Sequence, residues 1–338
     1  MSDTSFLGEM RDGAWLDAQV FDPIDYAVPD IIPEGLSILV GPPKVGKSWL
    51  VGGVGLGCAA GGLVFGRVKV TKRPVLYLAL EDGHRRLQSR FRHLMMGDGI
   101  PVGIHVITQA VSSAVIPTIT EFCQLNSGDR PMVIVDTLGR ARPPRPAGSD
   151  AYQWDYAVGA QLKACIDSFP GSSLLVVHHS RKQESADFVD SVSGTAGVAG
   201  AADAVLVLSR DRHSDQAVLA VTGRDVPESE FAIHCDEGIW LLDGDDLAAS
   251  QRAARTRRES KGLGDRALEV LALVNRRKET RAADLQEIGI DQDQARVYLK
   301  RLADAGRIGK SGRGIYTPTV ISVTSVTDSE AGLLGEDP

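Results

Sequence analysis

The chain has 338 residues, 43% of them hydrophobic, which is enough for one large and one small domain, each with its own core. Its formal net charge of −7 gives no overall sign of a nucleic-acid coat or a membrane-surface protein, and its four cysteines, with no CxxC pair, argue against a zinc site and a disulfide framework. Because the N-terminus is acidic where a signal peptide is basic, and no window has the apolar length of a membrane span, we expect a soluble cytoplasmic protein without a membrane partner.

Short apolar runs recur after an N-terminal segment, residues 1–21. We expect each run to form a strand buried on both faces, with helix-like stretches between several of them; the runs are residues 36–40, 74–80, 104–108, 131–136, 173–179 and 203–209. This alternation predicts an α/β fold with a largely parallel sheet, which binds ligands at the carboxyl ends of its strands. Residues 216–224 and 231–244 predict antiparallel strands at the sheet's edge, which completes a domain over residues 22–245.

The composition changes after Gly244. Residues 246–262 are polar and basic, as expected of a linker with some helical character. Residues 263–318 show helix, helix, helix and then a β-hairpin with a glycine-rich tip, which is the order of a small winged helix-turn-helix domain. Residues 319–338 are mixed in character and acidic toward the end, so we expect a flexible tail.

The sequence GPPKVGKS, between the first apolar run and a helix-like stretch, has the spacing GxxxxGK[ST] of a phosphate-binding loop. Glycines let successive backbone N–H groups face one anion, the lysine can reach the β and γ phosphates, and the serine hydroxyl can bind magnesium. The alternative is a chance glycine-rich turn, which the strand and helix on either side disfavour. We assign nine residues to nucleotide binding: Gly41, Pro42, Pro43, Lys44, Val45, Gly46, Lys47, Ser48 and Trp49.

Carboxylates follow two of the predicted buried strands. Asp136 ends the run MVIVD, where it can hold magnesium together with Ser48; a helix-capping role is the alternative. Glu81 and Asp82 follow the run LYLAL, and paired carboxylates there are costly unless they are used or capped. We interpret Glu81 as the base that polarises water, with Asp82 as the second choice.

A histidine pair and an arginine complete the candidate catalytic set. His178 and His179 end a third strand and must point to opposite faces, so only one can lie near a γ phosphate, and we choose His179. Arg224 ends a strand that we expect at the edge of the sheet, where it can act as an arginine finger toward a neighbouring subunit. A plain surface arginine is the alternative for Arg224, and Arg210 is the competing finger.

Together these motifs resemble those of the RecA-like superfamily of P-loop ATPases, and among them the hexameric helicases of the plasmid RepA type, related to DnaB. The resemblance covers residues 22–243 and includes the run SVSGTAGVAGAADAVLVL after VVHHSRK. It implies ATP and Mg²⁺ as cofactors, Glu81 as catalytic base, Asp136 on the metal side, His179 as phosphate sensor and Arg224 as finger. A glutamate after the second strand distinguishes this arrangement from that of AAA+ enzymes, in which it would stand at Thr137.

The resemblance also implies that the loops after two of these strands line a pore and grip single-stranded DNA. Residues 139–154 and 180–197 are polar and contain the basic candidates Arg140, Arg142, Arg145, Arg181 and Lys182. Two solvated surface loops are the alternative. A nucleotide-dependent change at the strand ends could be passed to whatever these loops hold.

The C-terminal unit differs in charge from the rest of the chain, because Lys and Arg exceed Asp and Glu by seven in residues 250–317. Its predicted recognition helix, about residues 291–305, presents Arg296 and Lys300 and has Val297, Leu299 and Leu302 as core candidates. Duplex DNA and a replication protein are the two partners considered.

The sequence therefore favours an ATP-driven hexameric helicase or translocase in replication of a plasmid, phage or mobile element. The alternative is an ATP-dependent DNA-binding regulator in which the ATPase is a switch. A small-molecule kinase fits less well, since Glu81 and His179 suit water activation and phosphate sensing.

Overall fold

The computed structural model describes residues 10–179, 196–210, 214–260 and 264–318. The chain divides into two compact units, Met1–Arg255 and Thr256–Pro338, and each is described by itself. Among the described residues, no helix combines the length and the apolar character that a bilayer crossing needs.

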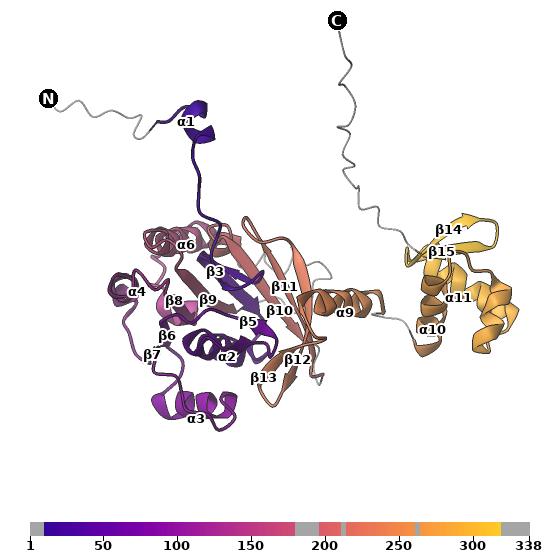
Figure 1. The fold of residues 1–338 in the computed structure, drawn as a ribbon, viewed down its shortest axis with the longest axis horizontal. Coiled ribbons are helices and arrows are strands. Elements are labelled where there is room, and N and C mark those ends of the chain that lie inside the picture. Colours follow the sequence, from indigo (N-terminus) through magenta and orange to yellow (C-terminus); the bar gives the residue numbers. More distant parts are fainter. Residues whose placement is uncertain (1–9, 180–195, 211–213, 261–263, 319–338) are drawn as a thin grey trace, which may run out of the picture. The chain divides into compact units, whose positions relative to one another are not determined.

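A nine-stranded sheet forms the centre of the first unit, in the order β13-β12-β11-β10-β3-β9-β8-β6-β7 (Figure 1). The strands from β10 to β7 in this order pair in parallel, and β11, β12 and β13 are added antiparallel beside β10. The bounds are β3 (Gly35–Gly41), β6 (Val75–Ala79), β7 (Ile104–Ile107), β8 (Met132–Asp136), β9 (Ser173–His179), β10 (Ala204–Arg210), β11 (Gln216–Gly223), β12 (Ser229–Asp236) and β13 (Ile239–Leu242). The predicted α/β class and parallel sheet are confirmed.

Helices cover both faces of this sheet (Figure 1). α2 (Lys47–Ala60) and α3 (His84–Leu94) pack on one face, and α4 (Ser112–Leu125), α5 (Leu138–Ala141), α6 (Ala151–Asp167) and α8 (Ala196–Ala199) on the other. Alternation along β3 sends Leu39 to the α2 face and Ile38 and Val40 to the α6 face. Double burial is why the inner strands are continuous apolar runs, whereas β7, at the edge, leaves Val106 36% exposed.

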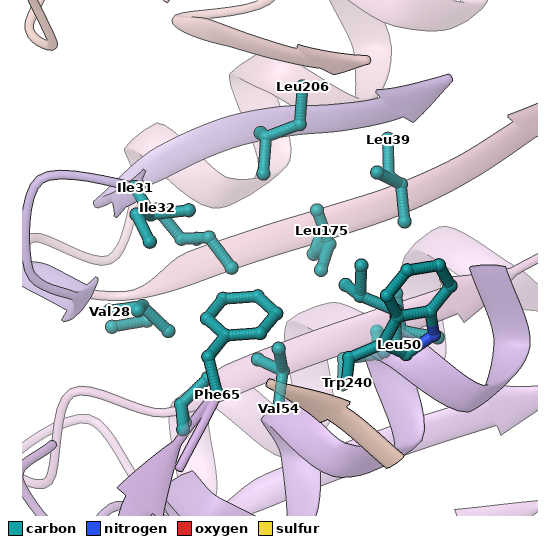
Figure 2. Close-up of a cluster of buried hydrophobic side chains, with 14 of the residues drawn as sticks. Val28, Ile31, Ile32, Leu39, Leu50, Val54, Phe65, Leu175, Leu206 and Trp240 are labelled. Carbon is teal, nitrogen blue, oxygen red and sulfur yellow. The ribbon is translucent and has the colours of Figure 1, made fainter. Parts of the chain in front are cut away.

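Short elements close the ends of the α2 face. The hairpin of β1 (Tyr26–Val28) and β2 (Ile32–Pro33) places Val28, Ile31 and Ile32 beside Phe65 and Leu175 in one core (Figure 2). The hairpin of β4 (Leu63–Val64) and β5 (Val68–Lys69) follows α2, and the short helix α1 (Gly13–Asp17) precedes β1. These hairpins fill space that the helices leave open.

The residues expected to form a linker are a helix, α9 (Leu247–Ser260). The Ser250 hydroxyl donates to the carbonyl of Ala232 on β12 (2.8 Å), and Ala254 is buried. The segment is helical because it carries small and long straight-chain residues with high helix propensity, and its small residues allow close packing on the sheet. The predicted linker 246–262 therefore needs correction over most of its length.

The second unit contains α10 (Asp265–Arg276), the 3₁₀ helix η2 (Ala282–Ile288), α11 (Gln292–Asp304) and a hairpin of β14 (Ile308–Gly312) and β15 (Ile315–Pro318). This order agrees with the expected order, while the winged-helix assignment stays a prediction. On α11, Ala295, Leu299 and Leu302 face the core, but Val297 is 55% exposed. The prediction for Val297 was wrong because residues 295, 299 and 302 share a helix face from which position 297 points away.

Candidate nucleotide-binding site

The predicted phosphate-binding loop joins β3 to α2. Gly46, at the helix N-cap, has φ = +107°, a conformation that side chains rarely adopt. A Cβ there would also lie 2.8 Å from the Trp240 ring, whose Nε1 donates to the Gly46 carbonyl (3.2 Å). A side chain at position 46 is thus excluded twice, and the backbone N–H groups at the start of α2 remain open to an anion.

Lys47 is a buried cation in this loop. Its Nζ donates to the carbonyl oxygens of Gly41 (2.7 Å) and Pro42 (2.9 Å) and lies 3.0 Å from His179 Nδ1. Burial lowers the pKa of Lys47 to about 8, although the charges of Asp136 and Glu81 act in the opposite direction. An ammonium group that has lost hydration and holds only neutral partners is poised for an anionic ligand.

Asp136 ends β8 and is only 4% exposed. The Tyr77 hydroxyl donates to Asp136 Oδ2 (2.9 Å), while Oδ1 is buried without a hydrogen bond among the described residues. Burial raises the pKa of this carboxyl, and the hydroxyls of Ser48 and Tyr77 partly oppose the rise. Asp136 does not cap α5, because Thr137 occupies the N-cap position.

The groups around Asp136 fit the predicted magnesium ion. An orphaned carboxylate oxygen beside the Ser48 hydroxyl is a hard oxygen donor set, which Mg²⁺ prefers. Within the described ranges, no cluster of three or more His, Cys, Asp or Glu residues could hold a metal alone. A cation here would therefore complete its coordination with phosphate oxygens and water, as is usual for Mg²⁺.

The two carboxylates after β6 have different surroundings. Asp82 pairs with Arg90 (2.6 Å) and Arg86 (3.1 Å), so both of its oxygens are occupied. Glu81 is 45% exposed at its side chain, accepts a hydrogen bond from the Thr137 hydroxyl (3.0 Å) and lies 4.0 Å from His179 Nε2. Of the pair, Glu81 is the carboxylate that faces the loop and is available to water.

The two histidines diverge as strand alternation requires. His179 faces Lys47 and Glu81, and burial together with the Lys47 charge lowers its pKa. Burial and the nearby Arg142 lower the pKa of His178 to about 4, so this imidazole is neutral near pH 7. The choice of His179 as the histidine beside the phosphate loop agrees with this geometry.

The arginine candidates lie at opposite edges of the sheet. Gly223 pairs with Ala204, the first residue of β10, and the Arg224 N–H donates to the Asp203 carbonyl (2.8 Å), far along the strands from the loop. Its strand β11 is interior, because β12 and β13 extend the sheet, so the predicted edge position was wrong. Arg210, at the loop edge, lies 6.0 Å over the Trp240 ring.

The predicted DNA-contacting side chains do not converge in this way. Arg140 and Arg145 are exposed, Arg142 forms an ion pair with Asp155 (2.5 Å), and Arg181 and Lys182 lie outside the described residues. In the second unit, Lys300 is exposed and Arg296 pairs with Asp293 (3.0 Å) on its own helix.

Three residues of the site were not anticipated. Tyr77 had a weak signal, a hydroxyl inside the apolar run LYLAL, and Thr137 had another, a polar residue directly after Asp136. Trp240 had none, because only the antiparallel extension of the sheet brings β13 next to the loop; Figure 2 shows the Trp240 side chain beside Leu50 of α2.

A phosphate loop after β3, a metal-side aspartate after β8 and a glutamate after the adjacent β6 define a RecA-like P-loop ATPase. The sequence profile of the family AAA_25, described as an AAA domain, matches residues 7–185, and the chain belongs to this family. A comparison with curated protein sequences found no significant match.

Two solved structures are similar in fold. One is an isolated ATPase domain, which superposes with a TM-score of 0.50 and 12% identity, over 62% of this chain and 85% of that domain. The other is a DnaB-like replicative helicase, solved to study its interactions with primase, which gives a TM-score of 0.51 and 12% identity, over 62% of this chain. The match spans 57% of that helicase chain, so what the two share is the fold of the ATPase part.

Proposed function

We propose that this protein is an ATP-hydrolysing DNA helicase or translocase of the RepA type that acts in replication of a plasmid, phage or mobile element. One observation carries the proposal: Lys47, His179 and Glu81 meet at one edge of the sheet, with His179 3.0 Å from Lys47 Nζ and 4.0 Å from Glu81 Oε2. A cradle, a sensor and a base in mutual contact suit hydrolysis that is read out by a following loop.

The residues would act in sequence. The triphosphate of ATP would draw the Lys47 ammonium away from its carbonyl partners, since phosphate oxygens are stronger acceptors. Ser48 and Asp136 would hold Mg²⁺, which neutralises charge on the β and γ phosphates. Glu81 would orient water and accept its proton, and His179 would register the presence of the γ phosphate.

Movement on DNA would follow from two strand ends. His179 is the last residue of β9, so displacement of its imidazole reaches the segment that contains Arg181 and Lys182. Asp136 is followed by α5 and by the loop that contains Arg140, Arg142 and Arg145. We propose that these loops grip single-stranded DNA in a homo-oligomeric ring, a hexamer by analogy with the RepA and DnaB helicases.

A neighbouring subunit would complete the site. Arg224 lies at the sheet edge away from its own phosphate loop, so it can serve only a second copy of the chain. Mixed preparations of Arg224→Ala and Glu81→Gln chains should recover part of the activity that each lacks alone. Recovery with Arg210→Ala in place of Arg224→Ala would transfer the finger role to Arg210.

The second candidate function is an ATP-dependent DNA-binding regulator. It is favoured by the C-terminal unit, which has its own core around Val270, Leu285 and Leu299 and a basic excess of seven charges in residues 250–317. In this case α11 would bind duplex DNA, or a replication protein, and ATP hydrolysis would be a slow switch.

One set of assays separates the two candidates. ATP turnover is measured with and without single-stranded DNA, together with displacement of a labelled strand, for the unmodified chain and for Glu81→Gln. A motor is stimulated by single strands and displaces the label, and Glu81→Gln does neither. Turnover that ignores single strands, with no displacement by the unmodified chain, would reject the motor and leave the regulator.

A further inference from the structure

Thr137 and Glu81 lie side by side although 56 positions separate them in the chain. The register of β6 and β8 pairs Ala79 with Asp136, and the Leu80 N–H donates to the Asp136 carbonyl (2.8 Å). The ladder thus continues to the last residue of β8. Glu81 and Thr137 come directly after it on neighbouring strands, where their side chains meet.

The Thr137 hydroxyl is not used as a helix cap. Thr137 is the N-cap residue of α5, and threonine in that position normally accepts a hydrogen bond from the first turn, but its side chain makes no such bond here. Instead Oγ1 donates to Glu81 Oε1 (3.0 Å), from a residue that is only 2% exposed. A capping group has been redirected toward a carboxylate on another strand.

Glu81 needs such a partner. Its backbone is held, because the next residue, Asp82, is fixed by Arg86 and Arg90 and by an N–H bond to the Ala79 carbonyl (3.2 Å). Its side chain is 45% exposed and would otherwise sample several rotamers in solvent. With Oε1 bound by Thr137, Oε2 is the oxygen left on the side of His179, 4.0 Å from Nε2.

We propose that Thr137 is a positioning residue for ATP hydrolysis, whose hydroxyl holds the Glu81 carboxylate with Oε2 directed to the attacking water. The inference rests on the proposed function, because it takes Glu81 as the base. The hydroxyl contributes to the chemical step and not to nucleotide binding, since its hydrogen bond goes to Glu81 and not to the phosphate loop. A misaligned base slows proton transfer even when substrate is bound.

The test compares three variants by steady-state ATP turnover. Thr137→Val keeps the branched shape and suits the extended backbone (φ = −128°) but lacks the hydroxyl. We expect kcat to fall about tenfold, the typical effect of losing one hydrogen bond to a charged group, with KM for ATP within about twofold. Thr137→Ser should restore most of kcat. The control is Thr108→Val, the same change one residue after the neighbouring β7, where the hydroxyl faces His84.

Thermal unfolding guards against a folding defect, and Thr137→Val should melt within a few degrees of the unmodified chain. A fall in kcat that Thr137→Ser does not restore, or a rise in KM at unchanged kcat, would overturn the positioning role. If Thr137→Val fails to fold, the comparison rests on Thr137→Ser and Thr137→Ala, whose kcat values must then differ about tenfold.

The Glu81→Gln background separates this inference from the proposed function. If Thr137 acts through Glu81, Thr137→Val should lower kcat in the unmodified chain but have little further effect in Glu81→Gln. Full turnover by Glu81→Gln would remove Glu81 as the base and the proposed function with it. Slow turnover by Glu81→Gln with unimpaired Thr137→Val would reject the positioning role alone.

Discussion

The nucleotide edge of the first unit and the basic surface of the second unit arrange polar groups in opposite ways. At the edge, Lys47, Asp136 and Thr137 are each at most 4% exposed and make hydrogen bonds between different strands. On α11, Arg296 and Lys300 are exposed, and Arg296 pairs within its own helix. Buried polar groups are costly unless a ligand uses them, whereas exposed charges are satisfied by water. Burial therefore marks the first region as a site, and the second remains a candidate surface.

The largest effect should come from Lys47→Ala. Loss of the buried ammonium removes the main cationic partner of the phosphates, so nucleotide affinity should fall about 100-fold or more. Titration with a fluorescent ATP analogue measures it. The control is Lys69→Ala, which removes an exposed ammonium that donates to the Gly61 carbonyl. Equal affinities for all three proteins would break the contrast, since the burial of Lys47 would then serve the fold alone.

Glu81→Gln and Asp82→Asn should separate catalysis from stability. Glu81→Gln should lower turnover by about 10²- to 10⁴-fold with nucleotide binding retained, the range for loss of a general base. Asp82→Asn should instead lower the free energy of unfolding by about 3 kcal/mol, because it leaves the Arg90 guanidinium, 10% exposed, without its ion pair. Turnover and denaturant unfolding of both variants decide, and the reverse pattern would make Asp82 the base.

His178 should make stability depend on pH. Its pKa in the folded protein is about 4, below the ordinary 6.5, so as pH falls the unfolded chain binds a proton first. The free energy of unfolding should therefore decrease between about pH 6.5 and pH 4, by about 3 kcal/mol from this group. Denaturant unfolding across that range should show a shallower slope for His178→Asn than for the unmodified chain or for His105→Asn. Identical slopes would contradict the burial of a neutral imidazole.

Tyr77→Phe should weaken the metal side of the site. The hydroxyl holds Asp136 Oδ2, and removing such a supporting hydrogen bond typically lowers metal affinity about 10-fold or more. The Mg²⁺ concentration for half-maximal ATP turnover should rise accordingly. Tyr26→Phe, which removes a hydroxyl bonded to the Asp225 carbonyl, serves as control. An unchanged Mg²⁺ requirement would mean that Asp136 is held well enough by its strand.

The smallest effect should come from the second unit. Replacing Arg296 and Lys300 together by alanine should weaken duplex DNA binding of the full chain a few-fold, because both charges are exposed and Arg296 is already paired. If both contact phosphates, the slope of log affinity against log salt should decrease by about two. Arg276→Ala, on α10, is the control. A change no larger than that of the control would remove α11 as the DNA surface.

Local sequence was sufficient for the features that neighbouring residues specify. The apolar runs predicted the parallel sheet because doubly buried strands must be apolar throughout, and GxxxxGKS between a strand and a helix predicted the loop. Alternation along β9 was enough to separate His178 from His179. In each case the physical cause, a period or a turn, lies within a few residues of its effect.

What the tertiary structure decided were contacts between strands that are distant in sequence. Strand order and register place the Thr137 hydroxyl on Glu81, the Tyr77 hydroxyl on Asp136 and the Trp240 ring on Gly46. The same pairing makes β11 an interior strand and carries Arg224 to the edge away from the loop. Such neighbours depend on how the whole chain packs, which no local pattern records; the chain by itself determined a triphosphate cradle, and the fold determined which groups surround it.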